Sequence, residues 1–304
     1  MRKQSIMPRL RRLFTVRNLV IGIPMIWLFA LAAAPLLLVL NISLAHMEVT
    51  SVSSLWHWAD DELTLKFNFG NYLYLGEDSL YFDTYVSSLK FAALTTLYCL
   101  IVGYPFAYFI SRAPAHLRTM LLMLVMLPFW TSFLLRIYAW KALLADNGIV
   151  NSGLMGLGVI ASPIHMMQTP FSLTIGMVYA YLPFMVLPLY ATLVKLDGRM
   201  LEAAADLGAS PFKTFWLVTV PLTKRGIIAG SLLVFIPAFG EYVIPELLGG
   251  PRTLMIARVL WDEFFSNNDW PMASAVTIVM ILLILVPMAL FNRYNDQTRV
   301  GDKT

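Results

Sequence analysis

Six long runs of apolar residues constrain this 304-residue chain more than any other feature. Each run is close to the 20 or so residues that an α-helix needs to cross about 30 Å of hydrocarbon. Only 13% of the residues are charged, about half the share in an average soluble domain. The chain is therefore predicted to be an all-α integral membrane protein with about six transmembrane helices. These are expected at residues 19–44, 83–110, 120–140, 171–193, 226–248 and 272–291.

The positions of the basic residues predict the orientation of these helices. If the N-terminal tail is cytoplasmic, the cytoplasmic segments hold 16 of the 22 Lys and Arg residues. Cytoplasmic loops are enriched in these residues, so both termini are expected in the cytoplasm. The net charge of +4 then reflects orientation and does not indicate a nucleic-acid partner. The expected order is a basic tail at 1–18, the first helix at 19–44, an outside (periplasmic) loop at 45–82, a five-helix core at 83–291 that includes a cytoplasmic loop at 194–225, and a cytoplasmic tail at 292–304.

The first apolar run follows a basic tail, as the core of a secretory signal peptide does. A cleavage site with small residues is available at Ser43 to Ala45. Signal cores usually have 7 to 15 residues, however, and this run reaches about 20. An uncleaved membrane anchor is therefore favoured over a removed signal.

Motifs for nucleotide binding and catalysis are absent from the sequence. Without a GxxxxGK[ST] loop, the chain is not expected to hydrolyse ATP. It has neither HExxH nor GxSxG, and its four histidines lack the spacing of metal ligands. Cys99, the single cysteine, lies in an apolar run and is expected to be buried. The chain is thus predicted not to be an enzyme and to hold no cofactor or metal of its own.

The long cytoplasmic connection at 194–225 is predicted to form two short helices. Gly208 suits the left-handed position that ends the first helix. Ser210 can cap the second helix, with Pro211 at its first position. By pattern alone, such a pair is either a loop on the membrane surface or a docking device. The apolar ridge expected on the second helix consists of Phe212, Phe215 and Trp216.

The residue types in this loop resemble the EAA motif of bacterial binding-protein-dependent (type-1) ABC importer permeases. That motif has Glu-Ala-Ala, a glycine four residues later and a Leu-Pro-type ending, which is replaced here by Val-Pro-Leu. The resemblance runs from about residue 53 to 291. Stretches such as MLPFWTSFLLRIYAW and ARVLWDEFFSNNDWPMASAV look like the polyamine branch, and most of all like its putrescine permeases. The loop positions that match the motif are Glu202, Ala203, Ala204, Gly208 and Pro221.

The resemblance implies a type-1 permease fold in the bacterial inner membrane. Its implied partners are a second, homologous permease, two ATPase subunits that hold ATP and magnesium, and a periplasmic polyamine-binding protein. The cargo would be putrescine, spermidine or both; the alternatives are another small solute and, less favoured, an ion-gradient-driven transporter, which would show repeated halves. The loop residues implied to couple ATPase motion to transport are Glu202, Ala203, Ala204, Gly208, Ser210, Pro211, Phe212, Phe215 and Pro221.

Ionisable groups within the spans suggest a substrate path. A central carboxylate such as Glu241 costs roughly 2.5 to 3.5 kcal/mol on insertion scales, so something must offset it. Either it faces a path and pairs with a substrate ammonium, or it pairs with Arg136 or Lys90 or lies near the outer water. Acidic residues near the outer ends of spans would also attract cations. The predicted path residues are Glu241, Asp83, Trp130, Tyr138, Tyr179, Asp262 and Glu263.

Close helix packing is predicted at one further position. Gly226 and Gly230 form a GxxxG step at the start of the fifth run. Small residues at this spacing let two helix backbones approach each other.

Overall fold

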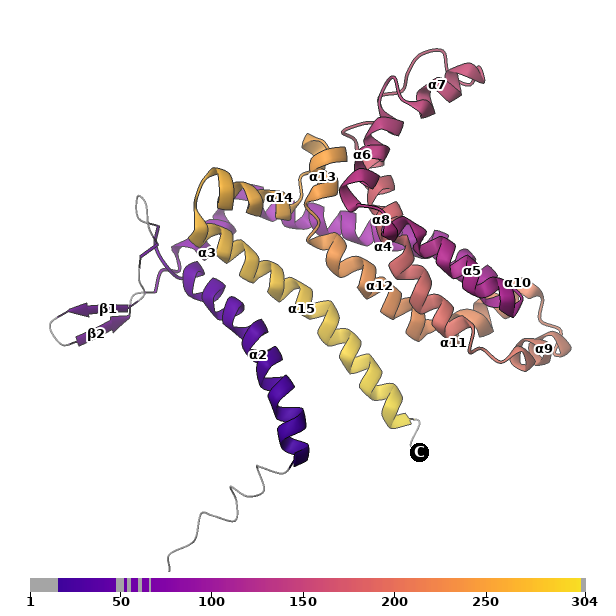
Figure 1. Ribbon diagram of the computed structural model, residues 1–304, viewed down its shortest axis with the longest axis horizontal. Coiled ribbons are helices and arrows are strands. Elements are labelled where there is room, and N and C mark those ends of the chain that lie inside the picture. The colour runs from indigo at the N-terminus through magenta and orange to yellow at the C-terminus, as the bar shows by residue number, and fades with distance from the viewer. Residues whose placement is uncertain (1–15, 48–51, 54–55, 60–61, 66, 302–304) are drawn as a thin grey trace, which may run out of the picture. The chain divides into compact units, whose positions relative to one another are not determined.

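The structure is a computed structural model that describes residues 16–47, 52–53, 56–59, 62–65 and 67–301, and it is largely helical (Figure 1). The contacts divide the chain into two units. The first comprises Met1–Leu75 and Glu263–Val279, and the second comprises Gly76–Asp262 and Met280–Thr304. Almost all of the predicted basic tail at 1–18 lies outside the described residues.

The first unit contains the N-terminal helix and most of the loop that follows it. Helix α2 (Val16–Ser43) has no buried residue in its most apolar stretch, so its apolar surface needs lipid or another protein around it. Strands β1 (Trp56–Ala59) and β2 (Glu62–Leu65) pair antiparallel, and α3 (Gly70–Glu77) follows. The Tyr72 hydroxyl lies 2.7 Å from Ser43 Oγ, which fixes α3 to the end of α2. The predicted outside loop at 45–82 thus contains two strands and a helix.

The second unit is built on three helices that pack against one another: α4 (Ser79–Arg112), α8 (Pro170–Leu193) and α12 (Lys224–Phe239) (Figure 1). Local residues start two of them, since the Asp78 side chain caps α4 and Thr169 forms a capping box with Ser172 at α8. Cys99 is fully buried in this core, as predicted. The remaining elements of the unit are α5 (Ala115–Met126), η1 (Leu127–Trp130), α6 (Phe133–Leu144), α7 (Ile149–Gly156), α9 (Gly198–Asp206), α10 (Pro211–Thr214), η2 (Phe215–Thr219), α11 (Val220–Leu222), α13 (Val243–Leu248), η3 (Pro251–Thr253) and α14 (Ile256–Trp261).

The predicted GxxxG step lies where α12 crosses α8. A Cβ atom added at Gly226 would stand 2.9 Å from the Pro188 carbonyl oxygen, and one at Gly230 would stand 2.8 Å from Met185 Sδ. Real Cβ atoms essentially never come this close to such atoms, so the two glycines are what permits the approach. The expectation of close backbone packing is confirmed.

The third predicted span, 120–140, is not one continuous helix. The chain forms α5, one turn of 3₁₀-helix in η1 and then α6, with a bend of 88° between the two halves. Pro128 has no N–H to donate to a preceding turn, and Thr131 adopts an extended conformation after it. The Thr131 hydroxyl donates to the Pro128 carbonyl at 2.8 Å, so a local group satisfies this oxygen at the bend.

The fifth predicted span, 226–248, also differs from the structure. Helix α12 ends at Phe239, and the short α13 begins at Val243. At its cytoplasmic end, α12 meets the helical segment Pro211–Leu222 at 68°. By length and composition, the described residues therefore hold four helices able to cross a membrane, or up to six when each bent pair counts as one span.

The last predicted span is longer than expected. Helix α15 (Trp270–Gly301) follows the π-helical turn η4 (Asp262–Ser266) and includes the expected span at 272–291. It continues through most of the segment 292–304 that was predicted to be a tail. The sequence there contains no proline or glycine before Gly301, so nothing in it ends the helix early.

We expect Gly226→Ala to weaken the packing of α12 on α8. The added methyl group meets a backbone carbonyl that cannot move aside, which predicts a loss of about 1–3 kcal/mol of stability. The measurement is the melting temperature of the purified transporter. Gly153→Ala is the matched control because a Cβ there meets nothing within 4 Å. Equal melting temperatures for the two variants would contradict the proposed close approach.

Candidate functional site

The cytoplasmic loop between α8 and α12 begins with a capped helix. The Asp197 carboxylate accepts the Arg199 N–H at 3.0 Å and starts α9. At the other end, Gly208 has a φ of +80°. Its N–H donates to the Ala205 carbonyl at 2.8 Å, while the Ala209 N–H donates to the Ala204 carbonyl at 3.0 Å. This pair of bonds is a Schellman motif, which explains why a glycine is required at this position.

The second helix of the loop starts as predicted but does not remain regular. Ser210 Oγ accepts the Lys213 N–H at 3.4 Å, and Pro211 occupies the first helical position. The helix then widens into a π-helical turn, η2, before the three-residue α11. Turns of π-helix inside α-helices are rare and often occur at functional sites.

Phe215 connects this loop to the helix core. Its ring makes edge-on contacts with Tyr104 at 5.4 Å and Tyr108 at 6.4 Å, both on α4. The Tyr104 hydroxyl lies 2.8 Å from the hydroxyl of Thr223, the residue between α11 and α12. The loop is therefore bonded to both α4 and α12, so that a displacement of the loop bears directly on two core helices.

The predicted apolar ridge of Phe212, Phe215 and Trp216 is continuous, with ring centroids 5.3 Å apart for Phe215 and Trp216 and 6.3 Å apart for Phe212 and Trp216. Phe215 turns inward, whereas Phe212 and Trp216 contact each other and remain 74% and 54% exposed. Leu207, beside the Schellman turn, is 88% exposed. Apolar side chains this exposed, on a segment without buried residues of its own in α9 and α10, are suited to contact with another protein.

The residues of the EAA pattern lie on the outer side of the same loop. Glu202 and Ala203 are exposed and Ala204 is half-buried, as is expected when one face of α9 packs and the other faces away. Between the two loop helices is a hollow of about 260 Å³ that Ala205, Ala209 and Phe215 help to line. Pro221 is exposed at the end of the loop.

Glu241 lies in the break between α12 and α13 and is only 9% exposed. Its Oε1 atom accepts the Val243 N–H at 2.9 Å and the Ile244 N–H at 3.3 Å. Its Oε2 atom accepts a short hydrogen bond from the hydroxyl of Tyr181 on α8. Three donors thus stabilise the carboxylate, and the side chain supplies the acceptor that the first N–H groups of α13 require.

Glu241 does not form an ion pair with either of the cations predicted as its partners. Among the described side chains, neither Arg136 nor Lys90 forms an ion pair with it. The Arg136 guanidinium instead stands over the rings of Phe129 and Phe133 at 5.1 and 5.6 Å from their centroids. The structural alternative for Glu241 is therefore favoured, with donors that differ from those predicted.

The aromatic residues predicted for the path are not gathered around Glu241. Trp130 is 80% exposed on η1, and the ring of Tyr138 is covered by the Lys141 ammonium at 5.9 Å. Tyr179 faces Trp140 at 5.5 Å. Within the described residues, no hydrogen bond or ring contact joins any of these three predicted aromatics to Glu241.

The acidic residues predicted for the path are mostly exposed. Asp83 on α4 and Asp262 at the start of η4 are both exposed. Glu263 accepts a hydrogen bond from the Asn267 amide at 2.9 Å. Glu246 on α13 pairs with Arg258 on α14 at 3.0 Å.

Tyr181 is the site residue that sequence reasoning missed. It lies 60 positions from Glu241, in an apolar run that already contains Tyr179. A tyrosine in such a run gives no local sign that its hydroxyl has a buried partner. The sequence signal lay at Glu241 instead. A carboxylate in a predicted span requires hydrogen-bond donors, and tyrosine is a frequent donor in apolar surroundings.

Several apolar spans and an exposed helical loop anchored to them define a multi-pass membrane protein. The comparisons agree with this class. Residues 100–300 match the family described as binding-protein-dependent transport system inner membrane component. The chain belongs to this family. It is a permease of the ABC transporter class in the inner membrane, a transport component and not an enzyme.

Individual relatives support the same assignment. The spermidine/putrescine transport system permease protein PotB of Escherichia coli (strain K12) is 44% identical over 253 residues, which cover 82% of this chain and 92% of PotB. The inner membrane ABC transporter permease protein YdcU of the same strain is 33% identical over 70% of this chain and 71% of YdcU. A chain of a bacterial alginate ABC transporter crystal structure shares the fold, with a TM-score of 0.72 at 14% identity over 97% of this chain and 98% of that chain.

We expect two substitutions of Glu241 to differ sharply in stability. Glu241→Ala leaves the Tyr181 hydroxyl and two N–H groups without their acceptor, at about 1–3 kcal/mol for each buried group. Glu241→Gln keeps an oxygen for the N–H groups and an amide opposite Tyr181, so it should remain within about 1 kcal/mol of wild type. The measurement is the melting temperature of the purified transporter.

The control for this pair is Glu202→Ala, which removes an exposed carboxylate. If Glu241→Ala melts like wild type, the carboxylate does not hold the helix break. If Glu241→Gln melts like wild type but abolishes transport, the negative charge itself is required, as a direct cation ligand would demand.

Proposed function

We propose that this chain is one of two permease subunits of an ATP-driven importer of polyamines. The observation that carries the proposal is the 44% identity to spermidine/putrescine permeases over 82% of this chain and 92% of the relative. The match covers most of both chains. The choice among putrescine, spermidine and both is left to the transport measurement below.

The energy source we propose is a pair of ATPase subunits that bind ATP and magnesium. This chain has no phosphate-binding loop of its own. Its exposed loop supports contact with such a partner, because Leu207, Phe212 and Trp216 present apolar surface beside the small residues of α9. A periplasmic binding protein that delivers the polyamine completes the proposed assembly, together with the second permease.

The coupling we propose runs from the loop into the core through named contacts. Movement of α9 and α10 would be transmitted by Phe215 to Tyr104 and Tyr108, and by Thr223 to Tyr104. Because α4 and α12 both pack on α8, a displacement of the loop alters the arrangement of all three helices. Two arrangements of these helices would open the path to the outside and to the inside in turn.

We propose an indirect role for Glu241 in the substrate path. Its three hydrogen bonds hold the α12–α13 break in place, so it shapes the path without offering a free carboxylate to the cargo. The exposed carboxylates of Asp83 and Asp262 raise the local concentration of cations, which is the appropriate sign for a polyamine.

The substrate proposal is tested by uptake of radiolabelled putrescine and spermidine in cells that lack only this chain. Wild type, expressed with its partner subunits present, should restore uptake of at least one polyamine, and excess unlabelled polyamine should compete. A second solute class of opposite charge, such as an oxyanion, serves as the control. If wild type reaches the membrane and restores neither polyamine, the cargo is another solute, and only the permease assignment remains.

The coupling proposal is tested at Gly208. Gly208→Val should uncouple ATP hydrolysis from uptake, because a β-branched residue disfavours the φ of +80° by about 1–3 kcal/mol and the Schellman turn would open. Gly208→Asn is the matched control, since asparagine tolerates the left-handed region. The measurement is the ratio of polyamine transported to ATP hydrolysed in proteoliposomes. Wild-type coupling in the valine variant would contradict the proposal.

A further inference from the structure

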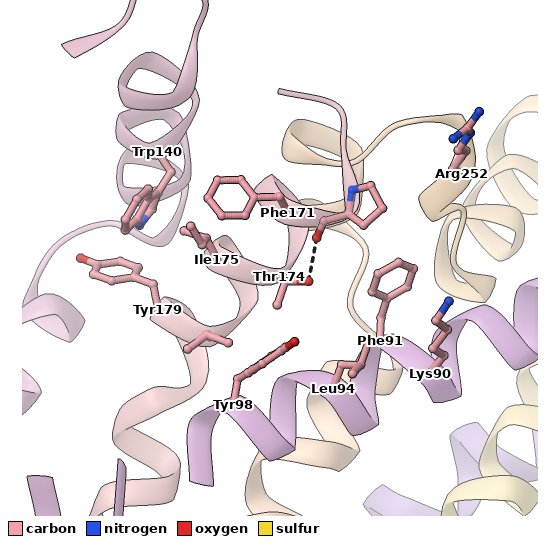
Figure 2. A pocket seen from close by; sticks show the side chains of 12 residues that line it. Lys90, Phe91, Leu94, Tyr98, Trp140, Phe171, Thr174, Ile175, Tyr179 and Arg252 are labelled. Carbon is pink, nitrogen blue, oxygen red and sulfur yellow. Dashed lines mark hydrogen bonds between the residues drawn. The ribbon is translucent and has the colours of Figure 1, made fainter. Parts of the chain in front are cut away.

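A large cavity in the second unit has a composition unsuited to a cationic cargo. It has a volume of about 910 Å³ and lies between α4 and α8, with Trp140 of α6 at one end (Figure 2). This volume is within the range of about 300–1,000 Å³ typical of ligand pockets. Aromatic and aliphatic side chains form most of its lining, among them Phe91, Leu94, Tyr98, Phe171 and Ile175. No carboxylate is among the residues that line it.

Two cations lie together on one side of this cavity. Figure 2 shows Lys90 and Arg252 at the end opposite Trp140 and Tyr179. Both side chains are exposed, and neither forms an ion pair with a described carboxylate. Two unpaired cations at the mouth of an apolar cavity repel a polyamine and attract an anion.

The backbone around the two cations is fixed. The Gly250 N–H donates to Thr253 Oγ1 at 2.7 Å, which closes the short turn that carries Arg252. On α4, Ser88 Oγ accepts the Ile256 N–H at 2.8 Å, so the segment next to Lys90 is bonded to the start of α14, four residues after Arg252. The two backbone segments that carry the cations are therefore held by hydrogen bonds of the fold.

The position of Lys90 restricts what the anion can be. It belongs to α4, the helix whose first residue is on the outside according to the charge distribution. A lysine on a membrane-spanning helix needs an anionic partner or must extend toward the membrane surface. A phospholipid supplies both parts of the complement: an acyl chain for the apolar lining and a phosphate for the cations.

We propose that this cavity binds an anionic phospholipid of the outer leaflet. Its phosphate is held by the Lys90 ammonium and the Arg252 guanidinium. One acyl chain lies along the surface formed by Phe91, Leu94 and Ile175. This inference does not rest on the polyamine proposal, because it concerns a ligand of opposite charge.

The test uses the complete transporter, stripped of lipid in neutral detergent and titrated with phosphatidylglycerol or phosphatidylcholine. Native mass spectrometry counts the lipid bound. Phosphatidylglycerol should bind more tightly than phosphatidylcholine, and the double variant K90Q/R252Q should weaken phosphatidylglycerol binding by about 30-fold. Lys141→Gln, which removes an exposed cation outside the cavity lining, should leave binding unchanged.

A second variant separates the apolar part from the charged part. Leu94→Trp fills the floor of the cavity and keeps both cations, so it should reduce the binding of phosphatidylglycerol without affecting inorganic phosphate. Equal affinity of wild type for the two lipids overturns the proposal. Full competition by inorganic phosphate would show an ion site in place of a lipid site. A disulfide between a cysteine at Phe171 and the second permease, with no lipid retained, would show that protein covers the cavity.

Discussion

The absence of water inside a bilayer is the constraint on which the rest of this structure depends. Every backbone N–H and C=O group within the hydrocarbon must find a partner in the protein, so each interruption of a helix needs its own donor or acceptor. At the α5–α6 bend, Thr131 bonds the Pro128 carbonyl. At the α12–α13 break, Glu241 accepts two N–H groups. At both helix interruptions, therefore, a nearby polar side chain is long enough to reach a backbone group that lacks a helical partner.

The same constraint explains how a carboxylate is kept within an apolar segment. A cation at Glu241 would require a second buried charge, with its own cost of dehydration. Two backbone N–H groups and one phenol hydroxyl stabilise the negative charge without adding a positive one. The arrangement ties α8 to the start of α13 and leaves Arg136 to stand over aromatic rings.

Small residues allow the core helices to pack closely, and an aromatic residue joins the loop to this core. Gly226 and Gly230 bring α12 against α8, while Phe215 places an aromatic ring from the loop against α4. The loop is thus attached on the side of the core and exposed on the other, where Phe212 and Leu207 remain uncovered. In the coupling proposed above, a segment attached in this way would transmit the movement of a bound partner to α4 and α12. The family to which the chain belongs uses such subunits in binding-protein-dependent transport.

The sequence by itself determined the features that depend on local pattern. Apolar length gave the approximate spans, the Lys and Arg bias predicted an orientation, and Gly208, Ser210 and Pro211 indicated where the loop helices end and begin. The tertiary structure alone decided which side chains meet. Pro128 and Glu241 were visible in the sequence, but their effect on helix continuity depends on acceptors and donors placed by folding. The partners Tyr181 and Glu241, and the two cations Lys90 and Arg252, lie far apart in the chain, and no local periodicity encodes a contact between residues brought together only by helix packing.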